Sequence, residues 1–481
     1  MNILNNQRHP RSIAFYFLLL LVYVLLKKYT MNKTYLKSIL VAILACVSFA
    51  SYSQIISTIA GIDTFGFSGD GGQATSAEMG KPEGIALDGS GNIYIADVNN
   101  GRIRKISASG IITTIAGGGS NGLGDGGPAT DAELNAPVGI ILDGSGNIYI
   151  ADFYENRIRI INTSGIIRTF AGNGVQSFYG DGGPATDAEL NAPYGLAIDT
   201  SGNIYIADCS NDRIRIVNIS GIIRTFAGIS FSGFSGDGGQ ATSAELNAPT
   251  GITSDNSGNV YIADWNNNCI RVVNTSGIIS TFAGNRAYGY SGDGGPATSA
   301  EFYSPTDVDV DVLGNIYIAD QHNDRIRIVN TSGSINTFVG NGYNSPNTGG
   351  YSGDGGSATD AELYLPESIA VDAMGNIYIG DELNNRVRKV TISTGINEFA
   401  SAHNPVAIYP VPNSGSFTIS GIAQGQIIEL YNYLGQQLSS TIADKATIQF
   451  DISGYPNGIY LIRVQNKDGS IVATKKVVKT D

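Results

Sequence analysis

The chain has little of the chemistry on which most catalytic and metal sites depend. Its 481 residues include only three cysteines, three histidines and one tryptophan, and charged residues make up 15% of the total. Cysteine this sparse excludes a fold held together by a disulfide framework. Only His322 and His403 lie beyond the N-terminal region, so a metal site built from several histidines is excluded as well. Catalysis is therefore the less favoured interpretation.

Positive charge is also scarce. The chain has 29 lysines and arginines against 42 aspartates and glutamates, for a formal net charge of −13. An acidic surface repels the phosphates of nucleic acids and of anionic lipids. We therefore expect no nucleic-acid partner, and the charge fits an exported protein or one that meets cations.

Long apolar runs occur only at the start of the chain. Residues 12–26, SIAFYFLLLLVYVLL, are fewer than the ~20 that a membrane-spanning helix needs. Residues 31–54, MNKTYLKSILVAILACVSFASYSQ, combine a lysine-bearing start, an apolar run and small residues, which is typical of a secretory signal peptide. We interpret residues 1–30 as an upstream extension or a misannotated start and residues 31–53 as the signal peptide. No stable transmembrane span is expected in the mature chain.

Glycine, by contrast, is abundant, and it belongs to a repeat. GNIYIAD begins at residues 91, 146, 202 and 314, and recurs with one change at 258 and 375. A period of this length is typical of a propeller or a solenoid. Residues 194–228 contain four segments in which apolar and polar residues alternate: YGLAID, IYIAD, RIRIVN and IIRTFAG. Short turns rich in Gly, Asn, Asp and Ser separate them. This pattern predicts a four-stranded antiparallel blade.

Six such blades are expected to form a ring over residues 54–400, because a lone blade cannot bury both of its faces. The motif of the fourth strand occurs once more, as IISTIAG at residues 55–61. Either residues 55–60 or residues 396–400 could supply the outer strand of the last blade, and we favour residues 55–60. Residues 401–406 are interpreted as a linker.

Close variants of the loop YSGDGGPATSAEF at residues 290–302 occur six times in the chain. A ring needs six joints, whereas an enzyme rarely needs six copies of a catalytic loop, so we interpret the motif as a strut between blades. Its Thr-x-x-Glu element predicts a capping box on a single helical turn. The expected pairs are Thr75 with Glu78, Thr130 with Glu133, Thr186 with Glu189, Thr242 with Glu245, Thr298 with Glu301 and Thr359 with Glu362.

The repeat P-x-G-I-A-x-D…G-N-I-Y-I-A-D-x-x-N-x-R-I-R resembles the NHL repeat, which forms six-bladed β-propellers. The resemblance implies an all-β fold and a platform that binds proteins or other ligands. A few relatives of this kind are enzymes, including amidating lyases and lactonase-like propellers.

The end of the chain resembles the type A sorting domain of type IX secretion in Bacteroidetes, through IYPVPNSGSFTI (408–419), DISGYPNGIYLIRV (451–464) and KKVVK (475–479). The resemblance implies that residues 407–481 form a small Ig-like β-sandwich that engages the type IX secretion machinery. The chain would then be secreted or attached to the outer surface. Whether the sorting domain is cleaved stays open.

The candidate site lies on the rim over blades four and five, where the repeats differ from one another. The Asp of IAD is followed five residues later by Arg, which predicts an ion pair across the turn in five blades. In blade four Cys269 replaces this arginine, so Asp264 is expected to lack its partner, and the only tryptophan, Trp265, follows directly. The predicted ion pairs are Asp97 with Arg102, Asp152 with Arg157, Asp208 with Arg213, Asp320 with Arg325 and Asp381 with Arg386.

Blade five carries two further irregular acids. Asp307 and Asp309 stand where most other blades have small residues, on a strand expected to line the central channel. Two carboxylates near a channel could hold a hard cation such as Ca²⁺. The alternative is a hydrated polar channel, with Trp265 packed on the neighbouring blade. The remaining rim candidates are Thr250, Gln321 and His322.

The function that we favour from the sequence is a binding platform for an extracellular protein or glycan. A divalent-metal-dependent lactonase or hydrolase and a structural or adhesion component remain as alternatives. The ligand, the oligomeric state and a disulfide between Cys209 and Cys269 stay open.

Overall fold

The computed structural model describes residues 53–343, 350–393, 406–409, 415–432, 437–467 and 471–479. The chain divides into two compact units, one of which comprises Ser53–Ser393. The described residues contain β-strands and single turns of 3₁₀-helix. The signal peptide and most of the linker expected from the sequence lie outside the described residues.

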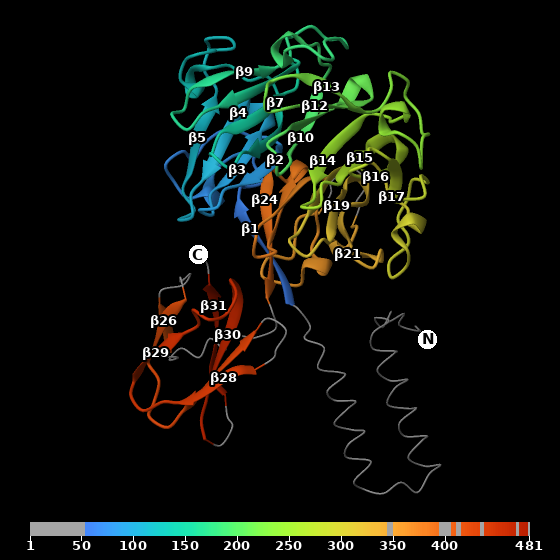
Figure 1. Ribbon diagram of the computed structural model, residues 1–481. Helices are drawn as coiled ribbons and strands as arrows, with labels where there is room; N and C mark the ends of the chain where they lie inside the picture. The colour runs from blue at the N-terminus through green and yellow to red at the C-terminus, as the bar shows by residue number, and fades with distance from the viewer. Residues whose placement is uncertain are drawn as a thin grey trace, which may run out of the picture. The chain divides into compact units, whose positions relative to one another are not determined.

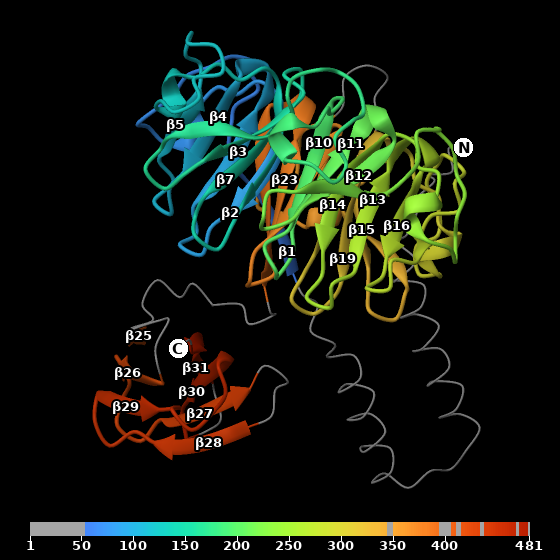
Figure 2. The same ribbon diagram turned by 45° about the horizontal axis from the view of Figure 1, so that its top comes forward.

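The larger unit is a propeller of six four-stranded antiparallel sheets. The blades follow one another along the chain from blue to orange (Figures 1 and 2). In chain order their strands are β2 (Pro82–Leu87), β3 (Ile93–Asp97), β4 (Arg102–Ile106) and β5 (Ile112–Gly117); β6 (Pro137–Leu142), β7 (Ile148–Asp152), β8 (Arg157–Ile161) and β9 (Ile167–Ala171); β10 (Pro193–Ile198), β11 (Ile204–Asp208), β12 (Arg213–Val217) and β13 (Ile223–Ala227); β14 (Pro249–Ser254), β15 (Val260–Asp264), β16 (Cys269–Val273) and β17 (Ile279–Ala283); β18 (Pro305–Val310), β19 (Ile316–Asp320), β20 (Arg325–Val329) and β21 (Ile335–Val339); and β22 (Pro366–Val371), β23 (Ile377–Asp381), β24 (Arg386–Ser393) and β1 (Ser53–Ala60).

The first strand of the chain completes the last blade. β1 pairs antiparallel with β24, with Ser53 opposite Ser393 and Ile56 opposite Val390, and Figure 1 shows the blue strand beside the orange one. The expectation that residues 55–60 close the ring is confirmed, whereas residues 396–400 lie outside the described residues. Contacts between β22 and β2 close the ring of inner strands.

The blades are held together by apolar faces that pack on one another. The second strand of a blade, IYIAD in most copies, is buried over its whole length in β7 and β11, because neighbouring blades cover both of its faces. One cluster joins Ala151 and Ile158 of the second blade to Leu196 and Ile206 of the third. Burial on both faces explains why isoleucine, alanine and tyrosine follow one another there without the alternation of a half-exposed strand.

Short 3₁₀ turns occupy one place in every repeat and a second place in five of the six. One set precedes the inner strands, and a second set follows the second strands in five blades. They are η1 (Ala74–Ser76), η3 (Ala129–Asp131), η4 (Ala185–Asp187), η6 (Ala241–Ser243), η8 (Ala297–Ser299) and η10 (Ala358–Asp360), then η2 (Val98–Asn100), η5 (Cys209–Asn211), η7 (Trp265–Asn267), η9 (Gln321–Asn323) and η11 (Glu382–Asn384).

The inner strands approach one another so closely that a glycine is needed at their third position in blades one to four. A methyl group on Gly139 would overlap the carbonyl oxygen of Tyr194 on the next inner strand, and one on Gly84 would overlap that of Val138. Glycine at this position therefore lets each of these four inner strands approach the next one closely.

Replacing Gly139 by alanine should lower the free energy of unfolding by about 1–3 kcal/mol, because the inner strands of two blades must separate to admit the methyl group. Gly144→Ala is the matched control, since its added methyl group would meet no atom within 4 Å. Urea unfolding of the two variants measures the difference. Equal stabilities would contradict the close approach of the inner strands.

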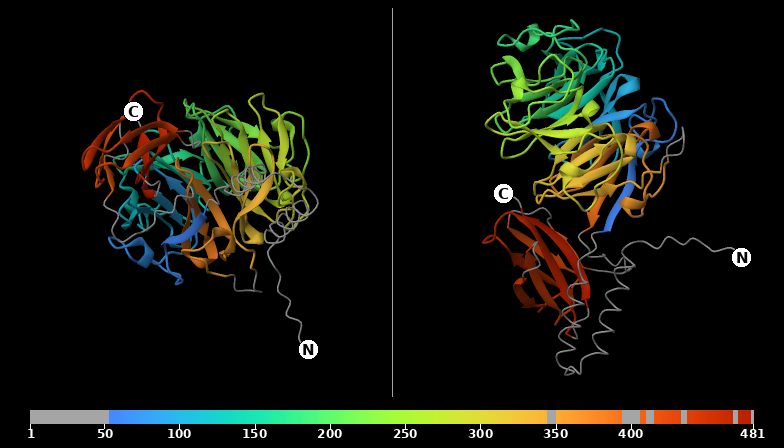
Figure 3. Two further views of the ribbon diagram at one scale, coloured as in Figure 1. Left: turned by 90° about the horizontal axis from the view of Figure 1, so that it is seen from below. Right: turned by 90° about the vertical axis from the view of Figure 1, so that its right-hand side faces the viewer.

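The smaller unit contains two sheets. One has the order β25 (Ala407–Tyr409), β26 (Ser416–Ser420), β29 (Thr447–Asp451), and the other β28 (Gln437–Ile442), β27 (Ile427–Asn432), β30 (Gly458–Gln465), β31 (Ile471–Lys479). Phe417 and Phe450 of the first sheet share one core with Ile428 and Ile462 of the second. This β-sandwich is red in Figure 3. The prediction of an all-β propeller followed by a further small β domain is confirmed.

Candidate functional site

The capping boxes expected in the repeated loops are not formed. Thr75 is the second residue of η1, and its side chain is exposed, while the residue before the helix, Gln73, makes no side-chain capping bond. The first amide of the turn, that of Ala74, already donates to the carbonyl of Gly110 at 2.8 Å. The amide that a Thr75 cap would bind, that of Glu78, donates instead to the Ser68 hydroxyl at 3.2 Å. None of the six turns has a side-chain cap. The predicted capping boxes were therefore wrong in all six repeats: Thr75 with Glu78, Thr130 with Glu133, Thr186 with Glu189, Thr242 with Glu245, Thr298 with Glu301 and Thr359 with Glu362.

The glutamates of the predicted boxes act through their backbone instead. In five blades, an arginine of the third strand donates to the carbonyl oxygen of the loop glutamate at 3.3–3.4 Å. The pairs are Arg104 with Glu78, Arg215 with Glu189, Arg271 with Glu245, Arg327 with Glu301 and Arg388 with Glu362. Glu189, Glu301 and Glu362 also form isolated bridges to the start of their own loops. The contacts of these glutamates therefore hold the loop backbone in place and do not cap a helix.

The repeated part of the loop supplies an aspartate and a backbone carbonyl that bind the buried arginine of the third strand. In blade four the Arg271 guanidinium has no exposed surface and lies 3.4 Å from Asp264 Oδ2 and 2.7 Å from Asp237 Oδ1, the aspartate of the loop motif. Its two terminal nitrogens also donate to the backbone carbonyls of Glu245 and Ser235. We call this arrangement the arginine latch. Its members in the six blades are Arg104 with Asp97 and Asp70, Arg159 with Asp152 and Asp125, Arg215 with Asp208 and Asp181, Arg271 with Asp264 and Asp237, Arg327 with Asp320 and Asp293, and Arg388 with Asp381 and Asp354.

The predicted Asp–Arg ion pairs were therefore wrong by two residues. Asp97 and Arg102 are opposite on the ladder of β3 and β4, but Asp97 pairs with Arg104 at 3.3 Å. The Arg102 guanidinium instead lies 3.9 Å from the centre of the Phe67 ring in the loop. The same correction applies to Asp152 with Arg157, Asp208 with Arg213, Asp320 with Arg325 and Asp381 with Arg386, whose aspartates pair with the arginines of their latches.

Blade four is consequently not missing an ion pair. Asp264 is fully buried and paired with Arg271. Cys269 is buried and free, as is the less buried thiol of Cys209, and burial raises the pKa of Cys209 to about 12. In blade four, Cys269 stands where blade one has Arg102, the arginine that lies over the aromatic ring of the loop. Arg286 from the following loop takes this place and lies 4.4 Å from the centre of the Phe234 ring.

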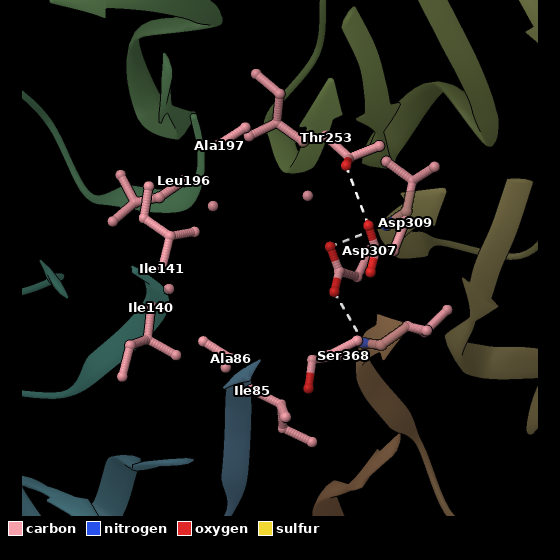
Figure 4. A pocket seen from close by; sticks show the side chains of 18 of the residues that line it. Ile85, Ala86, Ile140, Ile141, Leu196, Ala197, Thr253, Asp307, Asp309 and Ser368 are labelled. Atoms are coloured by element: carbon pink, nitrogen blue, oxygen red, sulfur yellow. Dashed lines mark hydrogen bonds between the residues drawn. The ribbon is translucent and has the colours of Figure 1, made fainter. Parts of the chain in front are cut away.

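The central channel contains a cavity of about 280 Å³ between the six inner strands. Apart from Glu83 and Tyr194, its wall on blades one to three is apolar, with side chains such as Ile140. Blades four to six add the polar side chains of Thr253, Asp307, Asp309 and Ser368 (Figure 4). Asp307 and Asp309 both belong to the polar wall.

Each of these two carboxylates is already held by backbone amides. Asp307 accepts hydrogen bonds from the amides of Val308 and Ile369, both at 2.9 Å. Asp309 accepts from the amides of Val310 and Val371 at 2.8 Å and from the Thr253 hydroxyl at 3.1 Å (Figure 4). The two side chains therefore join the inner strand of blade five to that of blade six.

Burial raises the pKa of Asp307 to about 7 and that of Asp309 to about 6, against the opposite effect of the amide hydrogen bonds. Among the described residues, no three His, Cys, Asp or Glu side chains are placed to share an ion. A cation at Asp307 and Asp309 stays a prediction.

One end of this cavity is crossed by a layer of polar side chains that we call the crossbar: Glu83, Tyr194 and Glu367. The Tyr194 hydroxyl lies 2.5 Å from Glu367 Oε1 and 3.0 Å from Glu83 Oε2. Gln321 donates from its side-chain amide to the second oxygen of Glu367. Next to the crossbar, Lys81 Nζ pairs with Glu382 Oε1 at 2.6 Å.

The structure brings together only part of the predicted site. Gln321 contacts the crossbar, and the buried Thr250 hydroxyl donates to the Thr306 carbonyl at 2.8 Å on the adjacent inner strand. Trp265, in η7, is partly buried, and its indole nitrogen has no hydrogen-bond partner. Asp264 and Cys269 belong to the scaffold of blade four rather than to the channel.

Sequence reasoning missed Glu83, Tyr194 and Glu367. All three occupy the second position of an inner strand, after the proline that starts it. The other blades have Val138, Thr250 and Thr306 there. This variation within an otherwise regular repeat was the signal that could have identified them.

Aromatic side chains are exposed on the long loops. Over blade five, Tyr288 is 76% exposed and Tyr303 41% exposed. The two ring centres are 5.8 Å apart, and the half-buried His322 ring follows at 4.7 Å from Tyr303. We call Tyr288, Tyr303 and His322 the aromatic row. Burial lowers the pKa of His322, so its ring favours the neutral form.

Comparison with known proteins agrees with this architecture. The Teneurin NHL domain family matches residues 64–123, 117–179, 173–232 and 231–291. Teneurin-1 of Gallus gallus is 30% identical over 314 residues, covering 58% of this chain and 11% of that protein. Teneurin-3 of Danio rerio is 26% identical over 463 residues, covering 83% of this chain and 16% of that protein. The chain thus spans less than a fifth of the length of these relatives.

Solved structures share the fold at low sequence identity. A protein of unknown function from Bacteroides thetaiotaomicron has a TM-score of 0.53 and 18% identity, with 71% of this chain and 77% of that chain covered. An auxiliary nutrient binding protein from Bacteroides ovatus has a TM-score of 0.52 and 15% identity, with the same coverage.

The smaller unit corresponds to a family of its own. The family described as the secretion system C-terminal sorting domain matches residues 407–480, and this domain directs export through the type IX system to the cell surface or beyond it. Within the described residues, no helix is both long and apolar enough to cross a bilayer. The chain is therefore an NHL-repeat β-propeller that carries a C-terminal sorting domain of the type IX secretion system.

Proposed function

We propose that this exported propeller is a binding module that takes an extracellular glycan or protein on the face formed by its long loops. The sorting domain would engage the type IX machinery during export, and the propeller would act once outside. The aromatic row carries the proposal, because the exposed Tyr288 and Tyr303 rings and His322 offer adjacent flat surfaces at one place on the rim.

Aromatic rings contribute more to recognition than most exposed side chains do. They supply large, rigid contact surfaces, and tyrosine adds a hydroxyl that can bind a polar partner. The same fold occurs in an auxiliary nutrient binding protein, so a binding role is compatible with this architecture. No specific observation favours a metal-dependent hydrolase, because the Asp307 and Asp309 carboxylates already bind backbone amides.

The test is binding of the full chain to a panel of soluble polysaccharides and mucin glycoproteins, measured by calorimetry. Tyr288→Ala and Tyr303→Ala should each weaken binding to the ligand that is found, by about tenfold or more, since a central aromatic contact is worth about 1–2 kcal/mol or more. Tyr179→Ala is the control, because Tyr179 is 70% exposed on a loop of another blade. An equal loss in all three variants, or no effect in any, would exclude the aromatic row as the contact site.

A further inference from the structure

The crossbar spans the channel from one side to the other. Tyr194 lies on β10 in the third blade, and Glu367 lies on β22 in the sixth blade, directly opposite in a ring of six. Glu83 lies on β2 in the first blade, next to Glu367. The tyrosine ring thus joins inner strands that no backbone hydrogen bond connects.

If both carboxyl groups are ionised, the crossbar has too few hydrogen atoms for the two hydrogen bonds at the Tyr194 oxygen. A phenol has one proton and can donate one hydrogen bond, yet the Tyr194 oxygen is within hydrogen-bond distance of both Glu367 and Glu83. One of these contacts must therefore take its proton from a carboxyl group. The separation from Glu367 is the shorter of the two, and 2.5 Å is the lower limit for a hydrogen bond between two oxygens.

We propose that Glu83, Tyr194 and Glu367 share one carboxyl proton across the channel, and that its loss lets the two carboxylates repel each other and opens the crossbar. Glu367 donates to the tyrosine oxygen, Tyr194 donates to Glu83, and Gln321 donates to the remaining oxygen of Glu367. The crossbar is thus a proton-controlled closure at one end of the cavity, a role separate from binding at the aromatic row.

The surroundings of the crossbar favour retention of this proton. Burial and the nearby Glu382 raise the pKa of Glu83 to about 7, and burial and the other carboxyl groups raise the pKa of Glu367 further above its usual range. Because Glu367 has the higher pKa, it keeps the last carboxyl proton when Glu83 ionises near pH 7, and the crossbar stays closed until the pH rises through the raised pKa of Glu367. The charged and titratable groups that face the crossbar are Lys81, Asp307, His322 and Glu382.

None of these neighbours can compensate the second negative charge. Lys81 is the only permanently positive group among them, and Glu382 already binds it at 2.6 Å. Asp307 adds a further carboxyl group to the polar wall, and burial of His322 disfavours its charged form. A doubly ionised crossbar would therefore be an unpaired, largely buried pair of like charges.

Opening of the crossbar need not separate the blades. Backbone carbonyls of the same two strands are held separately: the Ser368 hydroxyl donates to the Glu83 carbonyl, and the Thr306 hydroxyl donates to the Glu367 carbonyl at 2.8 Å. We therefore expect the side chains to move while the inner strands stay in place.

The experiment is carbon NMR of the full chain labelled at the tyrosine ring carbon that bears the hydroxyl, with the Tyr194 signal assigned by its absence in Tyr194→Phe. Between pH about 7 and about 10, a range that does not exceed the usual tyrosine pKa, this signal should shift as the last carboxyl proton is lost. Burial raises the pKa of the Tyr194 phenol itself above that range. A soluble gadolinium chelate should broaden it more strongly above the transition, because the ring becomes accessible.

Glu367→Gln should abolish the titration, because its amide keeps one acceptor toward Gln321 and one donor toward Tyr194 at every pH. Glu83→Gln is the second variant, with the donor on the other side of the tyrosine. Glu133→Gln, at an exposed loop glutamate, should titrate like the parent. A Tyr194 signal that does not titrate in the parent, or that titrates equally in Glu367→Gln, overturns the shared proton. A titration without increased broadening overturns the opening.

Discussion

Replacing Arg271 by methionine should lower the free energy of unfolding by about 3–5 kcal/mol, the range observed when one partner of a buried ion pair is removed. The variant leaves the Asp264 carboxylate, which is fully buried, without its cation. It also leaves the Asp237 carboxylate without the guanidinium that ties the long loop to blade four. Methionine fills much of the vacated volume, so the loss reports on charge and hydrogen bonding more than on a cavity.

The measurement is urea unfolding followed by tryptophan fluorescence. Trp265 is the only tryptophan in the chain, and it directly follows Asp264, so its emission reports on the blade that carries the substitution. Arg224→Met is the matched control, because Arg224 is exposed on the outer strand of blade three and should change stability by no more than about 0.5 kcal/mol.

A second substitution separates the ion pair from general disruption of the blade. In the Arg271→Met background, Asp264→Asn removes the unpaired charge and should cost less than it does in the parent, or should even stabilise the protein. Additive effects of the two substitutions would mean that Arg271 and Asp264 do not interact as the latch requires.

The second large effect is expected at the strand that closes the ring. Ile56→Ala should lower the free energy of unfolding by about 2–5 kcal/mol, as for other large-to-small changes in a packed core. Ile56 is fully buried and packs between the last two blades with Leu363 and Ala319. Its backbone also exchanges hydrogen bonds with Gly355 and Gly356 of the long loop.

The adjacent residue provides the control. Ile55 lies on the same strand, but its side chain is 39% exposed, so Ile55→Ala should cost well under half as much. Thermal and urea unfolding of both variants measure the difference. If the two substitutions have the same effect, β1 does not contribute to the core as the structure shows, and closure of the ring would have to depend on backbone pairing alone.

The repeat period and the alternation of residues were enough to predict the blades, because every copy places strands and turns at the same spacing. Side-chain partners were harder. Arg102 and Arg104 both follow Asp97 on the same side of the next strand. The spacing to Arg104 recurs in all six blades, whereas the spacing to Arg102 is broken in blade four by Cys269, so the unbroken spacing was the signal that could have identified the latch arginine. The spacing of Thr75 and Glu78 matched a capping box, but the Glu78 amide that such a box would cap donates to the hydroxyl of Ser68 at the start of the same loop.

The crossbar could not be predicted because its members become neighbours only in the closed ring. Tyr194 is separated from Glu83 by 111 residues and from Glu367 by 173 residues. Each is ordinary as a single residue of an inner strand. The sequence does mark the position as variable, but only the order of the blades around the axis shows that these three of the six side chains meet.

The pairing of β1 with β24 has a mechanical consequence. Ser53, where the propeller chain begins, lies opposite Ser393, where it ends, so the chain enters and leaves at the same end of the β1–β24 ladder. Tension applied between these two residues acts across the ladder, and it would break the hydrogen bonds one after another rather than all at once. The blade closed by two distant segments is therefore the weakest point of the ring under tension. The other five blades, each built from one continuous stretch of chain, would bear the force only after this seam has peeled apart.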